Sequence, residues 1–270
     1  MNITFIGGGN MASALISGLL QQGYSAEQLH VVEINAENRD KIKQSFGIPA
    51  VADLADGISN SDVIVLSVKP QQLFELTQKL VPLLNNQLIL SIAAGIRAAD
   101  LMRWLGGYQR VVRAMPNTPS LVRSGVTGLY AAAGTSESDK KDAESILAAV
   151  GSTLWVDDEE VLHAVTAISG SGPAYVFYFI ESMQQAAIEL GLTPSQARQL
   201  SLQTFTGASK LADTSDEDVA TLRARVTSKG GTTEQAILTM EKNDIKSKII
   251  TAIHAANKRS RELSDEYSRI

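Results

Sequence analysis

Apolar residues alternate between two periods along the first 160 positions of the chain. Short apolar runs predict buried β-strands, and between them apolar residues recur every three or four positions, the spacing of an amphipathic helix. The runs that predict strands cover residues 3–6, 29–34, 63–68, 88–92, 111–115 and 154–156. The segments that predict helices cover residues 11–22, 36–46, 71–80 and 138–150. This alternation predicts an α/β domain whose parallel sheet is covered on both faces.

The strand pattern stops near residue 160, and the rest of the chain predicts helices alone. Their expected ranges are 160–190 with an interruption at 169–173, then 194–212, 216–228, 233–241 and 245–263. We therefore expect an N-terminal domain over residues 1–160 and an all-α domain over residues 161–270. Long helices in so small a domain need another surface to cover their apolar faces, and a partner subunit is the expected cover.

The composition excludes several classes of function. The formal net charge is −5, so no basic surface is expected for nucleic acid or anionic lipid. The chain has no cysteine, which excludes disulfides and thiolate chemistry, and its three histidines lack zinc-ligand spacing, so no metal site is expected. There is no signal-peptide pattern and no apolar run long enough to cross a bilayer. We expect a cytoplasmic protein with neither nucleic-acid nor membrane partners.

A glycine motif joins the first predicted strand to the first predicted helix. Gly7, Gly9 and Ala12 give the pattern G-x-G-x-x-A, in which Gly7 permits a tight turn and Gly9 lets a pyrophosphate approach the backbone. The motif is weak by itself. Here the strand before it, the helix after it and the second strand fall where a dinucleotide site needs them, which favours such a site over a simple glycine turn.

The end of the second predicted strand bears on the choice of coenzyme. An acid at the position of Glu33 usually bonds the adenine ribose hydroxyls and repels a 2′-phosphate, which favours NADH over NADPH. Arg39 is close enough in sequence to bind a phosphate instead. A solvated charge at a strand end is the plain alternative, so both coenzymes remain candidates.

Three other segments follow predicted strands, where the ligands of open α/β sheets lie. In Ser67-Val68-Lys69-Pro70, the lysine can be a catalytic cation or can make only a backbone contact to the cofactor. The small side chains of Ala93 and Ala94 leave room for a ring. Asn117 can bond either the cofactor or its own turn.

Residues 226–241 run from two glycines into a helix start. Thr232 and Gln235 have the spacing of a capping box, and the first N–H groups of a helix lack partners inside it. A carboxylate can therefore bind bare backbone here, and a capped helix after a flexible loop is an equally good interpretation. In residues 169–175 small residues interrupt a long helix, which permits either a site or a tight helix crossing.

Together these motifs resemble the pyrroline-5-carboxylate reductase family over essentially the whole chain. Residues 226–237 are the most specific part, and residues 7–12, 68–70, 93–95, 115–119 and 169–175 match in order. The resemblance implies a Rossmann-like dinucleotide-binding domain followed by an all-α dimerisation domain. It also implies a homodimer whose helical domains interlock around the active site, and dimers of this family can assemble into decamers.

The resemblance further implies an activity and its residues. The activity is reduction of 1-pyrroline-5-carboxylate to L-proline by NADPH or NADH, the last step of proline biosynthesis. On matching positions, Ser228, Gly231 and Thr232 would hold the substrate carboxylate, Thr233 would bond the ring nitrogen, and Glu159 would be an acid near the substrate. The implied cofactor contacts are Ile6, Gly7, Gly8, Gly9, Asn10, Met11, Ser67, Val68, Lys69, Pro70, Ala93 and Ala94.

Three positions depart from the pattern of that family. Lys229 stands where proline is usual, Glu33-Ile34 where many members have Asn-Arg, and Asp53-Leu54 where an asparagine often meets the adenosine. No histidine matches a proton-donor position, so we expect the imine to arrive protonated or to take a proton from water.

Two rival functions are weighed against this one. A β-hydroxyacid dehydrogenase needs a lysine acid on the helix after the domain boundary, where this chain has Ser-Gly-Ser-Gly-Pro-Ala-Tyr. A non-enzymatic dinucleotide sensor would not need the loop at residues 228–233.

Overall fold

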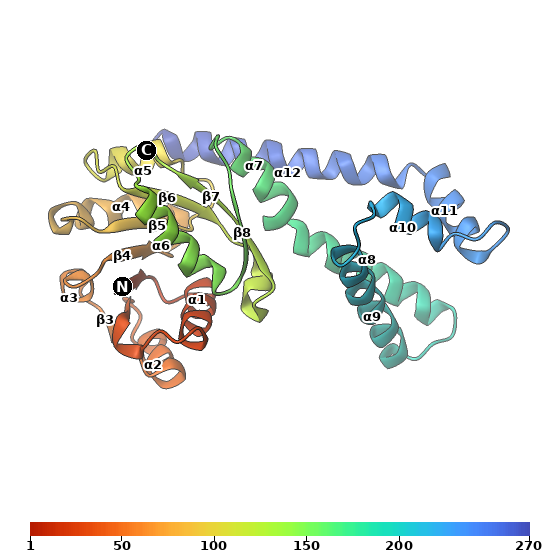
Figure 1. Ribbon diagram of the computed structural model, residues 1–270, viewed down its shortest axis with the longest axis horizontal. Coiled ribbons are helices and arrows are strands. Elements are labelled where there is room, and N and C mark those ends of the chain that lie inside the picture. The colour runs from red at the N-terminus through yellow and green to blue at the C-terminus, as the bar shows by residue number, and fades with distance from the viewer. The chain divides into compact units, whose positions relative to one another are not determined.

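The computed structural model of the protein describes all 270 residues and separates into two compact units. The first unit comprises residues 1–171 and 256–270, and the second comprises residues 172–255. The chain leaves and re-enters the first unit within its helical part, because the last helix, α12 (Ile245–Ser268), contributes residues to both units. Figure 1 shows α12 as one uninterrupted helix.

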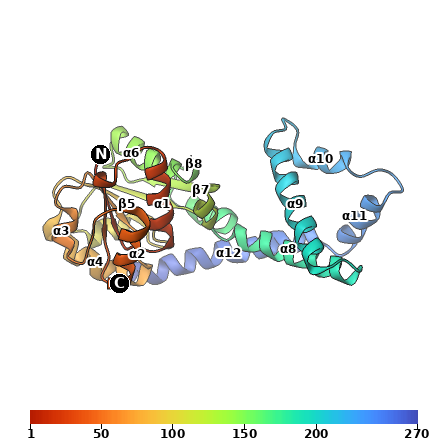
Figure 2. The same cartoon turned by 90° about the horizontal axis from the view of Figure 1, so that it is seen from below.

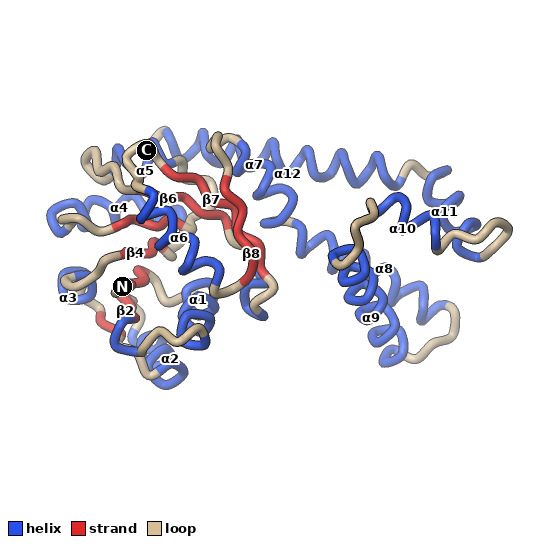
Figure 3. The backbone as a smooth tube through the Cα atoms, in the orientation of Figure 1, coloured by secondary structure: helices blue, strands red, loops and turns tan.

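The first unit is built on one eight-stranded sheet with the order β3-β2-β1-β4-β5-β6-β7-β8, drawn in red in Figure 3. The strands are β1 (Ile3–Ile6), β2 (Leu29–Val32), β3 (Ala50–Val51), β4 (Val63–Leu66), β5 (Leu88–Ser91), β6 (Val111–Met115), β7 (Gly125–Ala131) and β8 (Gly151–Trp155). All neighbours pair in parallel except β6 and β7, which are antiparallel. The order of the first six is that of a doubly wound dinucleotide-binding sheet.

Helices cover both faces of this sheet. They are α1 (Asn10–Gln21), α2 (Ala36–Phe46), α3 (Leu54–Ile58), α4 (Pro70–Leu80), α5 (Ala98–Trp104) and α6 (Glu137–Ala148). Successive side chains of a strand point to opposite faces, so Phe5 of β1 lies in the core under α1 and α6, whereas Ile6 lies in the core under α4 and α5. The predicted α/β domain covered on both faces is confirmed.

The pattern of apolar residues did not predict two of the strands and two of the helices. β3 is only two residues long, and β7 is broken by Gly125, Thr127 and Gly128, so neither forms an apolar run. The expectation of a parallel sheet is wrong at β7, which runs antiparallel to β6. The short helices α3 and α5 were not predicted either. Of the expected strands, residues 154–156 are the most displaced, since β8 begins at Gly151.

The helical part begins with α7 (Val161–Val165) and a π-helix (Thr166–Gly170) and continues with α8 (Gly172–Glu189). The remaining helices are α9 (Pro194–Asp213), α10 (Val219–Arg225), α11 (Thr232–Lys242) and α12. The second unit leaves large apolar side chains in solvent, among them Phe177 at 65% exposure and Leu190 at 85%. Apolar exposure on this scale marks an interaction surface. No helix is long and apolar enough to span a bilayer.

Candidate cofactor and substrate sites

A cavity of about 650 Å³ opens at the carboxyl ends of β1, β2 and β4. The order of the strands reverses between β1 and β4, and ligands of doubly wound sheets bind at this switch point. Eight of the expected cofactor residues line the cavity: Ile6, Gly7, Gly8, Gly9, Glu33, Ser67, Val68 and Lys69. The structure thus brings together segments that follow three different strands.

The glycine loop after β1 has the geometry that the motif requires. Gly7 has a φ of +100°, and a Cβ atom there would lie 2.8 Å from the Ser67 carbonyl oxygen, so only glycine fits. The Ser67 hydroxyl donates to the carbonyls of Ile6 and Gly7 at 2.9 and 2.8 Å, which ties the loop after β4 to the loop after β1. A Cβ at Gly9 would meet nothing within 4 Å, and Gly9 caps α1. The loop and the first turn of α1 therefore fit a pyrophosphate group.

Glu33 places a carboxylate in this cavity, next to the end of β2. Its Oε2 accepts a hydrogen bond from the Gly8 N–H at 3.0 Å, and its Oε1 accepts one from the Asn35 N–H at 2.8 Å. The Arg39 guanidinium donates instead to the carbonyls of Glu33 and Ile34, at 2.8 and 2.9 Å. The acid thus lines the cavity, while the arginine is bound to the backbone of the same turn.

The other expected cofactor residues do not line the cavity. Asn10 and Met11 lie in the first turn of α1, Pro70 begins α4, Ala93 is buried against the core, and Ala94 is exposed. Asn117 is buried, and its amide bonds the chain itself. Its Nδ2 donates to the Ser169 carbonyl and its Oδ1 accepts from the Val126 N–H, both at 3.0 Å. Of its two candidate roles, the geometry fits the structural one.

The interruption expected at residues 169–173 lies where the π-helix ends at Gly170, Ser171 belongs to no helix, and α8 begins at Gly172. The Ser171 N–H donates to the Thr166 carbonyl at 2.8 Å, a π-helical bond that connects α7 to α8. A Cβ at Gly170 would lie 2.7 Å from Met115 Cε, so glycine permits close packing with the end of β6. Single π turns of this kind are frequent at functional sites.

The loop from Ser228 to Thr233 brings four expected substrate residues together in the second unit. Gly230 adopts a φ of +74°, and the Gly231 N–H donates to the Ser228 carbonyl at 3.0 Å. The N-cap of α11 is Gly231, so Thr232 lies inside the helix. The predicted capping box between Thr232 and Gln235 therefore does not form.

Glu234 bonds back to the loop before α11 in place of Gln235, because its Oε2 accepts a hydrogen bond from the Gly230 N–H at 2.7 Å. The N–H groups of Thr232 and Thr233 donate to no other group of the chain. They are the bare amides that an anion can bind. Thr232 is exposed and Thr233 half-buried, so both remain accessible.

Glu159 belongs to the first unit, whereas the loop from Ser228 to Thr233 belongs to the second. Its Oε1 accepts from Arg113 Nη1 at 2.8 Å and from the Ala98 N–H, at the start of α5, at 2.6 Å. Arg113 lies on β6 with its side chain 2% exposed, so Glu159 neutralises a buried charge. Arg113 was not among the predicted residues, although it is a lone charge within the apolar strand Val-Val-Arg-Ala-Met.

His163 lies beside this ion pair and has no role in the expected chemistry. It is buried, and its Nδ1 lies 2.8 Å from Ser260 Oγ of α12, while its Nε2 has no hydrogen-bond partner and lies 3.8 Å from Glu160 Oε1. Burial, and then the positive charge of Arg113, lower the pKa of the His163 imidazole below its ordinary value. No three His, Asp or Glu side chains are grouped to hold a metal ion.

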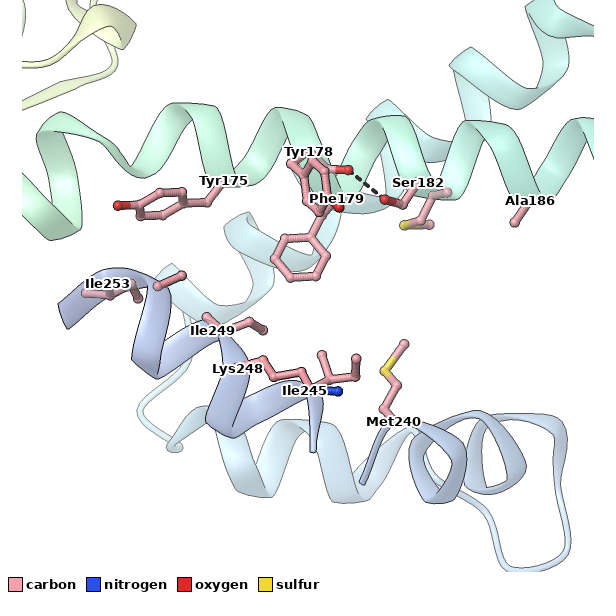
Figure 4. A pocket seen from close by; sticks show the side chains of 12 residues that line it. Tyr175, Tyr178, Phe179, Ser182, Ala186, Met240, Ile245, Lys248, Ile249 and Ile253 are labelled. Carbon is pink, nitrogen blue, oxygen red and sulfur yellow. Dashed lines mark hydrogen bonds between the residues drawn. The ribbon is translucent and has the colours of Figure 1, made fainter. Parts of the chain in front are cut away.

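A second cavity, of about 680 Å³, lies within the second unit between α8, the end of α11 and the start of α12. Figure 4 shows Tyr175 and Phe179 of α8 facing Ile249 and Ile253 of α12, with Met240 at one end. Its lining is almost wholly apolar, and Lys248 is the one charged residue. It fits an apolar side-chain surface better than a small anionic substrate.

Comparison with known proteins adds to this geometry. Residues 159–263 match the family model described as pyrroline-5-carboxylate reductase dimerisation, and residues 2–95 match that described as NADP oxidoreductase coenzyme F420-dependent. The chain is 48% identical to the pyrroline-5-carboxylate reductase of Pseudomonas aeruginosa, over 98% of this chain and 97% of the relative. It is 41% identical to that of Haemophilus influenzae, over 97% of each.

Solved structures agree along the whole chain. A pyrroline-5-carboxylate reductase from Coxiella burnetii is 43% identical, with a TM-score of 0.92 over 97% of this chain and 98% of that one. The Plasmodium falciparum pyrroline carboxylate reductase with NADP bound is 29% identical, with a TM-score of 0.88 over 98% of each.

Proposed function

This chain belongs to the pyrroline-5-carboxylate reductase family, and we propose that it reduces 1-pyrroline-5-carboxylate to L-proline, the last step of proline biosynthesis, using NADPH or NADH. One observation carries the proposal. This chain of the family has both a cavity lined by the glycine loop, at the ends of β1 and β4, and a helix start at which the N–H groups of Thr232 and Thr233 have no partner in the chain. The cavity suits a dinucleotide and the helix start suits a carboxylate.

The first unit would hold the coenzyme through three groups of residues. Gly7 to Gly9 and the first turn of α1 would bind the pyrophosphate, since the backbone there is open and carries a helix N-terminus. Glu33 would bond the adenine ribose. Ser67 to Lys69 would lie at the nicotinamide half, at the end of β4. The coenzyme supplies the hydride that reduces the C=N bond.

The loop before α11 would anchor the substrate. The amides of Thr232 and Thr233 and the hydroxyl of Ser228 would hold the carboxylate, and the Thr233 hydroxyl would orient the ring nitrogen. Lys229 is exposed beside them and adds a positive charge for an anionic substrate. A threonine hydroxyl is a poor acid, so the proton would come with the substrate as an iminium ion, or from water.

The helical part would form a homodimer. The dimerisation model covers residues 159–263, and the second unit exposes large apolar side chains and an apolar groove along α8 and α12. A partner subunit would cover these surfaces. Further assembly of dimers into decamers, and a cytoplasmic location, complete the proposal.

A direct spectrophotometric assay tests both the proposed activity and the role of Thr233. Purified protein is mixed with 1-pyrroline-5-carboxylate and NADPH or NADH, and loss of the reduced-nicotinamide absorbance is followed. Thr233→Ala should lower kcat by about tenfold or more while coenzyme affinity stays within about twofold, because only substrate contacts are lost. Thr239→Ala is the matched control, since that hydroxyl of α11 donates only to the Gln235 carbonyl at 2.8 Å.

The outcomes separate clearly. Absence of coenzyme oxidation by the unaltered protein would reject the reductase and favour a non-enzymatic dinucleotide-binding protein. Normal turnover in Thr233→Ala would remove Thr233 from the mechanism and leave the activity standing.

A further inference from the structure

The last turn of α12 touches two loops at the coenzyme end of the sheet. The hydroxyl of Tyr267 accepts a hydrogen bond from Gln71 Nε2 at 3.0 Å, and Gln71 lies in the first turn of α4. The ring of Tyr267 packs on Gly95, where an added Cβ would lie 3.2 Å from Tyr267 Cε2. Gly95 has a φ of +80°, which favours glycine, and an added Cβ would also crowd the ring of Tyr267.

Other bonds fix this turn to α5 and the loop before it. Arg97 donates to Asp265 Oδ1 at 2.7 Å and to Ser268 Oγ at 3.1 Å. Arg103 donates to the Ser268 carbonyl at 3.1 Å. Figure 1 shows the C-terminus beside α5, where these contacts place it, and Figure 2 shows it near α4. The exposed Arg97–Asp265 ion pair is weak alone, but together with the two hydrogen bonds to Ser268 it holds the turn that carries Tyr267 in one position.

The two loops that Tyr267 joins belong to one half of the coenzyme site. In a doubly wound fold the first three strands form one mononucleotide-binding half, and the next three form the other. The loops after β4 and β5 therefore lie at the nicotinamide half. Gln71 directly follows Ser67–Pro70, and Gly95 directly follows Ala93 and Ala94, so Tyr267 contacts each loop beside its expected coenzyme segment.

We propose that Tyr267 is a positioning residue, which braces the loops after β4 and β5 against each other and so sets the orientation of the nicotinamide for hydride transfer. This inference rests on the proposed function. Hydride transfer is sensitive to the placement of the two reacting carbons, so a small displacement of these loops lowers the rate of the chemical step. The adenosine half of the coenzyme would bind at the loops after the first three strands, so its affinity should not change when Tyr267 is altered.

The test uses Tyr267→Phe, Gln71→Met and the double variant in the full-length enzyme. Each single variant removes one side of the 3.0 Å bond and leaves the tyrosine ring or its phenyl equivalent on Gly95. Tyr24→Phe is the matched control, because Tyr24 is a half-buried tyrosine in the other core cluster. The measurements are kcat, the dissociation constants of NADP⁺ and of ADP-ribose, and the melting temperature.

We expect each single variant to lower kcat by about threefold to tenfold, the factor that loss of one hydrogen bond converts to. The double variant should be no slower than the singles, because both remove the same bond. Affinity for NADP⁺ should fall, affinity for ADP-ribose should stay within about twofold, and Tyr24→Phe should behave as the unaltered protein.

Two results would overturn the proposal. One is an unchanged kcat and NADP⁺ affinity in both single variants. The other is an equal loss of NADP⁺ and ADP-ribose affinity together with a lower melting temperature, which would assign Tyr267 to general stability. If the unaltered protein fails to reduce 1-pyrroline-5-carboxylate, the proposed function is lost, but the comparison of NADP⁺ with ADP-ribose still decides whether Tyr267 positions the nicotinamide half.

Discussion

The carboxylate of Glu33 and the backbone N–H of Gly8 are joined by a 3.0 Å hydrogen bond across 25 residues of sequence. A side chain at Gly8 would require the end of the Ile42 side chain to move. The acid at the end of β2 and the glycine loop after β1 both line the cavity at the carboxyl ends of β1, β2 and β4. In the proposed coenzyme site, this negative charge would face the adenine ribose.

We predict from this contact that the enzyme favours NADH, and that Glu33→Gln shifts the preference toward NADPH. Glutamine keeps the acceptor for Gly8 and removes the charge that repels a 2′-phosphate. The ratio of kcat/KM for the two coenzymes should change by about tenfold, or about 1.4 kcal/mol. Glu37→Gln is the control, because Glu37 is an exposed acid in α2 outside the cavity. A strong NADPH advantage in the unaltered enzyme, unmoved by Glu33→Gln, would contradict the prediction.

Loss of Glu159 should destabilise the fold. Arg113 is buried and Glu159 is its ion-pair partner at 2.8 Å, so Glu159→Ala leaves an uncompensated buried charge. We expect the free energy of unfolding to fall by about 3–5 kcal/mol, measured by urea denaturation. Glu160→Ala should cost less than about 1 kcal/mol, because exposed ion pairs contribute little. The Glu160 side chain is 45% exposed, although it pairs with Arg97 and Arg261.

The same variant tests the expected substrate role of Glu159. If Glu159→Ala unfolds with the stability of the unaltered protein and instead raises KM for 1-pyrroline-5-carboxylate, the acid acts on the substrate. A loss of stability with an unchanged KM in the folded fraction would assign it to Arg113 and the start of α5.

His163 should make stability depend on pH. Burial, followed by Arg113, lowers the pKa of this imidazole in the folded state, so the unfolded chain binds more protons between the two pKa values. The free energy of unfolding should therefore fall as pH drops below about 6.5 toward the lower folded-state pKa. Urea denaturation of His163→Asn between these values should show a flatter pH profile. The control is His254→Asn, an exposed position on α12, which should keep the slope of the unaltered protein.

Gly230 should be needed for substrate affinity. Its φ of +74° strains any other residue, although a Cβ there would meet nothing within 4 Å. Gly230→Ala should raise KM for 1-pyrroline-5-carboxylate, because relief of about 1 kcal/mol of strain reshapes the loop that presents Thr232 and Thr233. Gly47→Ala is a close control, since Gly47 has a φ of +67° with open space after α2. Gly47→Ala should lower the free energy of unfolding by a similar amount without changing KM for 1-pyrroline-5-carboxylate. Equal KM values in the two variants would refute the role of Gly230.

Local features were readable from the sequence because they depend on neighbours in the chain. The tight turn at Gly7 needs a positive φ, which glycine alone adopts freely, and β1 and α1 are marked by the spacing of their apolar residues. The α/β class followed from the same spacing. Together with the family resemblance, these features predicted eight of the residues that line the cavity at the carboxyl ends of β1, β2 and β4.

Contacts between residues far apart in the sequence could not be predicted from it. β7 carries no apolar run, and it is a strand because β6 and β8 supply hydrogen bonds on both sides. Asn117 was open to two roles until the fold brought Ser169 and Val126 within 3.0 Å.

The sequence by itself therefore determined the α/β class, most of the strands and helices, the glycine loop after β1, and the family to which the chain belongs. Only the tertiary structure decided that Glu159 neutralises Arg113 and that Tyr267 joins Gln71 to Gly95. The physical reason is that periodicity and turn chemistry act within a few residues, whereas these contacts link residues 46 to 196 positions apart. Such pairs exist only after the sheet and its covering helices have packed.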